Sequence, residues 1–248
     1  MKKLLLVTAI AATFMGNFAH AEDAKPDNEL SFNAALTSDY RYRGISQSRL
    51  KPAVSVGADF VNNPTGFYVG TWASSIKWIK DAGGKGDIEL DIYAGKRGEI
   101  VKDVSYDVGV LTYIYADNQL SRVAGFANAN TTEIYGQVGY GPAYVKYSNA
   151  VTDTFGNVNS KNSGYLDIGA NIDIAEGTVL NLHAGHQKIK NGSFYSYTDY
   201  KVGVTKDFGF LSGSLAVIGT DAKTGAYSTP SGKDNGKTAL VVAISKTF

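Results

Sequence analysis

The sequence predicts an all-β chain that forms a transmembrane antiparallel up-and-down β-barrel of about twelve strands. Three observations predict this fold. Apolar and polar residues alternate with period two along many short segments, helical periodicity is absent, and long polar connections alternate with tight turns. A barrel in a bilayer requires this alternation, because successive side chains face lipid and lumen in turn.

The N-terminal residues predict a secretory signal peptide over 1–21. Lys2 and Lys3 precede an apolar stretch from Leu4 to Phe14. Small residues at Ala19 and Ala21 occupy the two positions that a signal peptidase reads, so we expect cleavage between Ala21 and Glu22. A membrane anchor is the alternative, but that stretch is too short for a hydrocarbon core that needs about twenty residues.

The rest of the chain predicts one domain. Residues 22–29 would form a short periplasmic segment, and residues 30–248 the outer-membrane barrel. The chain has no cysteine, which excludes thiol catalysis and cysteine-ligated metals. The formal net charge is +1 and no basic block occurs, so nucleic acid is not an expected partner. No cofactor is expected.

The first predicted strand runs from Leu30 to Gly44. In this segment Leu30, Phe32, Tyr40 and Tyr42 alternate with polar and charged residues. We therefore expect the apolar and aromatic residues to face lipid. The other predicted strands lie near 54–60, 67–78, 87–95, 104–115, 131–139, 143–149, 164–173, 178–186, 197–206, 210–220 and 237–248.

The connections favour a barrel over a soluble β-sandwich. Long polar connections occur at 45–51, 79–86, 116–130, 150–163, 187–196 and 221–236, and tight turns lie between them. In an outer-membrane barrel the short turns face the periplasm and the long loops face outward. An even number of strands then places both termini on the periplasmic side.

Aromatic residues predict two girdles at the membrane interfaces. One group lies beside the short turns: Phe60, Phe67, Tyr140, Phe208, Phe210 and Phe248. A second group lies near the long loops: Tyr42, Trp78, Tyr115, Tyr165 and Tyr197. The terminal Phe248 is the expected signal for the barrel assembly machinery. A sandwich would also alternate, but it would not explain the girdles and the terminal Phe248 together.

Two segments carry a resemblance to a known family. The segment ALTSDYRYRGISQS (35–48) resembles the opening signature of the TorF-like porins, and GFYVGTWAS (66–74) resembles the second. These are proteobacterial outer-membrane proteins first catalogued as conserved and of unknown function. The resemblance extends from about Leu30 to Phe248. It implies an outer-membrane barrel regarded as a porin, without an established substrate.

The polar face of the strands predicts the lining of the lumen, where carboxylates outnumber bases. The predicted lining residues are Asp39, Arg41, Arg43, Asp59, Glu89, Asp91, Asp107, Glu133, Asp167, Asp199 and Lys201, and the same pattern adds Lys77, Asp87, Lys146 and Asp173. An acidic path favours cations. The sequence therefore predicts a mildly cation-favouring channel for passive diffusion of small hydrophilic solutes or ions. The alternative is a non-conducting barrel with a structural or adhesive role through its long loops.

Two clusters leave alternatives open. Asp39, Arg41 and Arg43 form either a selectivity element or an ion-pair network that holds the wall. The row of Asp87, Glu89 and Asp91 is interpreted as wall lining, since hard cations usually recruit carbonyl oxygens from loops as well.

An enzymatic function is not expected. A membrane hydrolase would need a serine and a histidine together on the lipid-facing surface. His183 and His186 fall on opposite faces of a strand, and no serine has a nucleophile-elbow pattern. No catalytic or metal-ligating residue is assigned.

Overall fold

The computed structural model describes residues 26–248. The predicted signal peptide over 1–21, the Ala21–Glu22 cleavage site and residues 22–25 of the predicted periplasmic segment lie outside the described residues. The first strand begins at Asn28, two residues before the predicted start of the barrel.

The described residues form a closed barrel of twelve antiparallel strands, which confirms the predicted fold. Each strand pairs with the next barrel strand in sequence, and the first closes the ring against the last. The barrel strands are β1 (Asn28–Thr37), β4 (Ala53–Asn62), β5 (Phe67–Ser75), β6 (Ile88–Val101), β7 (Val104–Tyr115), β8 (Thr131–Tyr140), β9 (Ala143–Ala150), β10 (Gly164–Ala175), β11 (Thr178–Lys188), β12 (Tyr197–Asp207), β13 (Ser212–Thr220) and β14 (Ala239–Thr247). A separate hairpin pairs β2 (Arg41–Tyr42) with β3 (Ile45–Ser46).

Within residues 26–248, helix is confined to three short turns in the connections. These are α1 (Trp78–Asp81), η1 (Leu120–Arg122) and η2 (Ser193–Tyr195). Over residues 26–248, no helix is long and apolar enough to cross a membrane.

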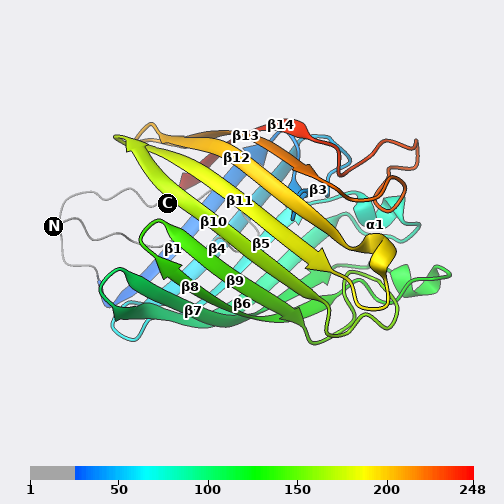
Figure 1. The fold of residues 1–248 in the computed structure, drawn as a ribbon, viewed down its shortest axis with the longest axis horizontal. Coiled ribbons are helices and arrows are strands. Elements are labelled where there is room, and N and C mark those ends of the chain that lie inside the picture. Colours follow the sequence, from blue (N-terminus) through cyan, green and yellow to red (C-terminus); the bar gives the residue numbers. More distant parts are fainter. Residues whose placement is uncertain (1–25) are drawn as a thin grey trace.

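The connections separate by length, as the sequence predicts. The short turns and the C-terminus lie at one end of the barrel, and the long loops with α1 lie at the other (Figure 1). In a bacterial outer membrane the long loops of such a barrel face outward and the short turns face the periplasm.

The two faces of the wall differ in polarity. Leu30, Val108 and Val202 alternate along their strands with inward residues, and each is at least 50% exposed on the outside. Phe67, Tyr140 and Phe248 form part of an exposed aromatic belt near the short turns. A closed barrel leaves no backbone group of its wall unpaired in hydrocarbon. This apolar exterior and closed wall are those of a protein of the bacterial outer membrane.

The predicted second girdle near the long loops is wrong. Tyr115, Tyr165 and Tyr197 are 3–6% exposed and lie inside the barrel. They share alternate positions with the polar inward residues of β7, β10 and β12, so the alternation takes precedence over the preference of tyrosine for an interface. Tyr42 also lies inside, and the Trp78 ring packs edge-on against Tyr115 at 5.0 Å between centroids.

Tyrosine rings on the wall lie over glycines of neighbouring strands. Tyr93 pairs with Gly70, and Tyr135 pairs with Gly109. A β-carbon at either glycine would collide with the facing tyrosine ring. The absence of a side chain therefore lets the rings lie flat on the inner wall and point their hydroxyl groups along it.

The first strand is shorter than predicted. β1 ends at Thr37 rather than at Gly44, and residues 39–50 are buried or half-buried inside the barrel instead of continuing the wall. Consequently β1 pairs with β14 over only five residue pairs, from Asn33–Thr247 to Thr37–Ala243. The period-two pattern of Tyr40 to Arg43 continues in the hairpin, so alternation alone does not reveal where the wall ends.

We predict that Val108→Arg destabilises the barrel by roughly 2–4 kcal/mol, because it places a charge on the lipid-facing surface. Val108→Leu is the matched control, since it remains apolar. Denaturant unfolding in lipid vesicles measures both. Equal stability of the two variants would mean that Val108 does not face lipid.

Candidate functional site: a hairpin across the lumen

The β2–β3 hairpin has a tight two-residue turn at Arg43-Gly44. Both residues have positive φ, 47° and 79°, as a type I′ turn requires. Two constraints favour glycine at position 44. Its φ is positive, and a β-carbon there would collide with Thr220 and Asp199 on the wall. The turn therefore fits closely against β12 and β13.

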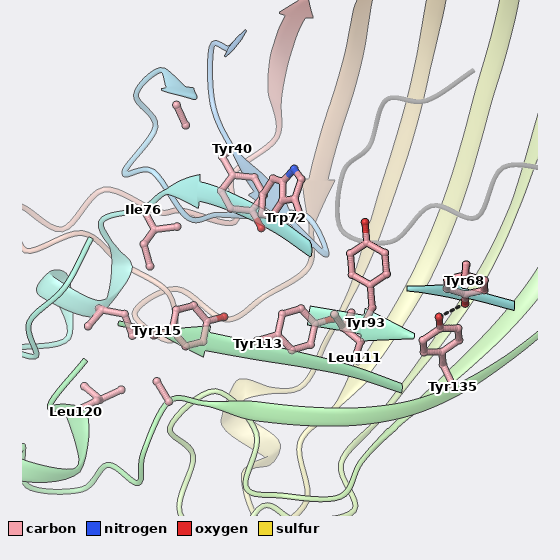
Figure 2. Packing of buried hydrophobic residues seen from close by; sticks show 13 residues of the cluster. Tyr40, Tyr68, Trp72, Ile76, Tyr93, Leu111, Tyr113, Tyr115, Leu120 and Tyr135 are labelled. Carbon is pink, nitrogen blue, oxygen red and sulfur yellow. Dashed lines mark hydrogen bonds between the residues drawn. The ribbon is translucent and has the colours of Figure 1, made fainter. Parts of the chain in front are cut away.

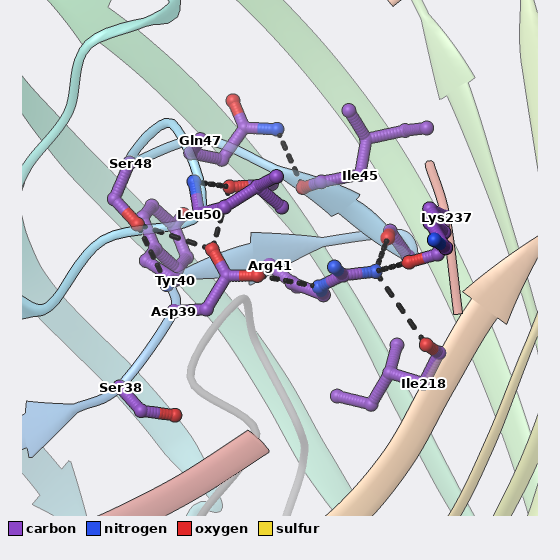
Figure 3. Close-up of polar contacts among 12 residues, drawn as sticks. Ser38, Asp39, Tyr40, Arg41, Ile45, Gln47, Ser48, Leu50, Ile218 and Lys237 are labelled. Atoms are coloured by element: carbon purple, nitrogen blue, oxygen red, sulfur yellow. Dashed lines mark hydrogen bonds and ion pairs between the residues drawn. The ribbon is translucent and has the colours of Figure 1, made fainter. Parts of the chain in front are cut away.

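An ion pair holds the base of the hairpin. Arg41 Nε donates to Asp39 Oδ2 at 2.7 Å, and Ser46 Oγ donates to Asp39 Oδ1 at 2.5 Å (Figure 3). The Arg41 guanidinium also donates to the carbonyl of Lys237 at 2.8 Å. Both charged side chains are at most 8% exposed. Asp39 and Arg41 thus serve as internal hairpin contacts and do not form the predicted row on the wall.

A second ion pair anchors the tip of the hairpin. Arg43 donates to both carboxylate oxygens of Glu133, at 3.0 and 2.6 Å, and to Gln187 Oε1 at 2.5 Å. Its guanidinium lies 4.0 Å from the centroid of the Tyr165 ring. These partners come from β8, β11 and β10, which lie across the ring from β1 and β4. The hairpin therefore crosses the lumen and is fixed to the far wall by a bidentate, desolvated pair.

Aromatic contacts fill the space beside the tip. The Tyr42 hydroxyl lies 2.6 Å from that of Tyr113 on β7. Phe155 from the 151–163 loop packs edge-on against both rings, with centroid separations of 5.5 and 5.2 Å. The tip of the hairpin is thus packed against β7 and against the 151–163 loop.

Two predicted lining residues accept hydrogen bonds from wall tyrosines. Tyr93 donates to Asp59 at 2.5 Å, and Tyr68 donates to Asp107 at 2.6 Å. Tyr68 also hydrogen-bonds Tyr135 across the barrel interior (Figure 2). Asp59 is half-buried, whereas Asp107 is buried.

The wall formed by β10 to β12 holds a mixed cluster. His183 lies between Asp167 and Asp199, with nitrogen–oxygen distances of 2.8 and 2.6 Å. Both contacts are hydrogen bonds when both ring nitrogens carry protons, which makes the ring a cation. Lys201 on β12 lies opposite His183 in the register of β11 and β12, and it is half-buried. His186 is on the outer face.

Glu89 and Asp91 are among the most deeply buried predicted lining residues, at 1% and 0% exposed. The Tyr40 hydroxyl donates to Glu89 Oε1 at 3.2 Å. Neither oxygen of Asp91 has a hydrogen-bond partner within residues 26–248.

Asp87 and Lys77 are not lining residues. Both lie in the 76–87 connection with side chains more than 40% exposed, and they pair with each other at 3.4 Å. A hydrogen bond from Lys80 at 2.7 Å, together with the charges of both lysines, lowers the pKa of Asp87 below its ordinary value. β6 begins only at Ile88, so the alternation of the strand does not apply to Asp87. Asp173 is also exposed, near the short-turn end of β10.

Several residues of this site were not predicted. Gln187 is neutral and lies at the end of its strand, so it gives no charge signal. Tyr113 and Tyr165 occupy the same alternate positions as Asp107 and Asp167, which is the signal that places them inside. Nothing in the sequence indicates that Phe155 packs against the hairpin.

A family model described as a bacterial protein of unknown function, Gcw_chp, matches residues 20–248. The chain belongs to the Gcw_chp family. No curated protein matches it in sequence.

Solved structures resemble this Gcw_chp protein in fold. The KdgM porin, solved in complex with disordered oligogalacturonate, has 7% sequence identity and a TM-score of 0.54, with 88% of this chain and 98% of that chain covered. A protein solved in work on in-meso crystallisation of membrane proteins has 7% identity and a TM-score of 0.50, covering 88% and 83%. OprD from Pseudomonas aeruginosa has 8% identity and a TM-score of 0.42, covering 88% and 66%. At these identities the likeness concerns the fold.

We predict that Arg43→Ala releases the tip of the hairpin. Removing one partner of a buried pair costs about 3–5 kcal/mol, because the remaining Glu133 carboxylate loses its counter-charge. The chain has no cysteine, so Ser46→Cys, at a fully buried position, reports release through its rate of maleimide labelling. Labelling should be slow in the otherwise native chain and fast with Arg43→Ala.

Lys80→Cys is the control for this measurement, because Lys80 is exposed and should label quickly in both backgrounds. Equal protection of Ser46→Cys with and without Arg43 would show that the ion pair does not hold the hairpin.

Proposed function

We propose that this Gcw_chp protein is a porin-like channel of the outer membrane, in which the β2–β3 hairpin forms the constriction. It passes small hydrophilic solutes or ions by passive diffusion and mildly favours cations. The observation that carries the proposal is the polar interior, in which carboxylates lie on several strands on both sides of the hairpin.

The distribution of charge supports a preference for cations. Arg41 and Arg43 are already paired with Asp39 and Glu133, so these bases contribute little free positive charge. Asp59 and Asp107 interact with neutral tyrosines. Carboxylates without a basic partner lower the energy of a cation in a low-dielectric lumen and raise that of an anion.

The resemblance to the TorF-like porins supports the same proposal. Its longest signature, over 35–48, spans the end of β1 and the whole hairpin. The segment that looks most like the family is therefore the one that crosses the lumen. We also propose that the barrel assembly machinery recognises Phe248, whose backbone pairs with Phe32 at the closure of the barrel.

The proposal is of a channel rather than an enzyme. The contacts of His183 are with Asp167, Asp199 and Tyr165, inside the barrel. A hydrolase acting on lipid would need its histidine and a serine on the outer face.

One observation favours a second function. Arg43 ties the hairpin to three strands of the far wall, which is also what a closed, non-conducting barrel would need. Such a barrel would act through its outer loops in a structural or adhesive role.

We predict discrete current steps when the refolded chain is inserted into a planar bilayer. Under a potassium chloride gradient the reversal potential should show cation preference, because carboxylates predominate in the lumen. The preference should weaken at 1 M salt, where the Debye length falls to about 3 Å. Asp59→Asn with Asp107→Asn should shift the reversal potential toward zero.

Arg43→Ala tests the constriction in the same experiment, and it should raise the single-channel conductance. A native chain that folds, judged by heat-modifiable gel mobility, and passes no current would establish the closed barrel instead. Anion preference would keep the channel but contradict the assignment of selectivity to the carboxylates.

A further inference from the structure

The pairing of β5, β6 and β7 sets two carboxylates inside an aromatic frame. Asp91 on β6 lies between Trp72 on β5 and Tyr113 on β7. One step along the same face, Glu89 lies between Ser74 and Tyr115. The two carboxylates are two residues apart, roughly 7 Å along one strand.

The hairpin closes this frame from inside the lumen. The Tyr40 ring packs edge-on against Trp72 with 5.3 Å between centroids, and its hydroxyl donates to Glu89. Figure 2 shows Tyr40 and Trp72 together above the wall that carries Tyr113 and Tyr115. Rings from β5, from β7 and from Tyr40 thus surround the two carboxylates, which are 1% and 0% exposed.

No basic group of the described part of the chain is positioned to compensate a negative charge on this pair. Three oxygens have no hydrogen-bond donor there, namely Oε2 of Glu89 and both oxygens of Asp91, and no ion pair reaches either residue. The nearest acidic neighbour, Glu133, is already bound to Arg43. Buried carboxylates without a partner are strongly unfavourable, so a cation from outside the chain would relieve the cost.

Two other buried carboxylates of the lumen, Asp199 and Asp39, have partners for both of their oxygens. Asp199 accepts from Tyr165 at 2.9 Å and contacts His183 at 2.6 Å. Asp39 accepts from Arg41, Ser46 and Ser48. The Glu89–Asp91 pair is therefore distinct in chemistry from the structural ion pairs of the same barrel.

We infer that Glu89 and Asp91 form a binding site for a primary ammonium group, which makes small organic amines a solute class of this barrel. A primary ammonium offers three donors, as the side chain of lysine does, and the site offers three unpartnered acceptors. The faces of Trp72, Tyr113 and Tyr115 attract a desolvated organic cation. Hard metal ions prefer six or more oxygen ligands and retain water, so the aromatic frame fits them poorly.

This inference rests on the proposed function for the access of the solute, but the binding itself does not require conduction. The two tryptophans of the chain flank the site, because Trp72 is paired with Asp91 and Trp78 packs on Tyr115. Intrinsic fluorescence of the refolded chain in detergent therefore reports on occupancy.

The experiment titrates the full chain with n-propylammonium chloride, and with potassium or calcium chloride at matched ionic strength. We expect a saturable fluorescence change with propylammonium only. Asp91→Asn should raise the apparent Kd about tenfold or more, since it removes a charge-assisted hydrogen bond. Asp87→Asn, the same substitution two residues before Glu89 but in an exposed connection, should leave the Kd unchanged.

Folding does not confound this test. Asp91→Asn preserves the shape of the side chain and removes a charge that lacks a partner, and heat-modifiable mobility on a gel verifies the barrel. No saturable change, equal responses to potassium and calcium, or an unaltered Kd in Asp91→Asn would each overturn the inference. A barrel that binds the amine but passes no current would overturn only the proposed function. A conducting barrel that ignores the amine would overturn only this inference.

Discussion

The constraint on which the rest of this structure depends is that every backbone amide and carbonyl of the wall must find a partner where lipid offers none. A closed antiparallel ring satisfies that requirement, and β1 meets β14 to complete it. Closure then fixes the faces, because alternate side chains have only lipid or the interior to meet. The apolar ones face lipid, and the interior receives buried charged residues such as Glu89, Asp91 and Glu133.

An interior loaded with charge needs internal organisation, and the β2–β3 hairpin supplies much of it. Arg41 forms an ion pair with Asp39, and Arg43 forms one with Glu133. The hairpin therefore supplies positive charge to the interior and also occupies part of its volume. The tyrosines of the wall complete the pattern by donating hydroxyl groups to Asp59 and Asp107. Channel selectivity and structural stability thus draw on the same set of carboxylates.

The strand pattern, the number of strands and the division into long and short connections could be predicted, because each follows from alternation and turn chemistry. The hairpin could not. Tyr40, Arg41 and Tyr42 alternate as a wall strand would, and only the distant partners of Arg43 show that the segment turns inward. The inward position of Tyr115 escapes prediction for a related reason, because the position in the strand outweighs the preference of tyrosine for an interface. Contacts between residues far apart in the sequence carry information that a local pattern lacks.

The early position of the hairpin in the chain bears on how the barrel folds. Arg43 is separated from Glu133 by 90 residues and from Gln187 by 144. Contacts of such long sequence separation form late, because the intervening chain must first be ordered. The hairpin is therefore synthesised near the beginning and docked near the end, after β8 and β11 have taken their places. The seam between β1 and β14 joins residues that are still further apart in sequence, so the same criterion places the docking of the hairpin before the closure of the ring.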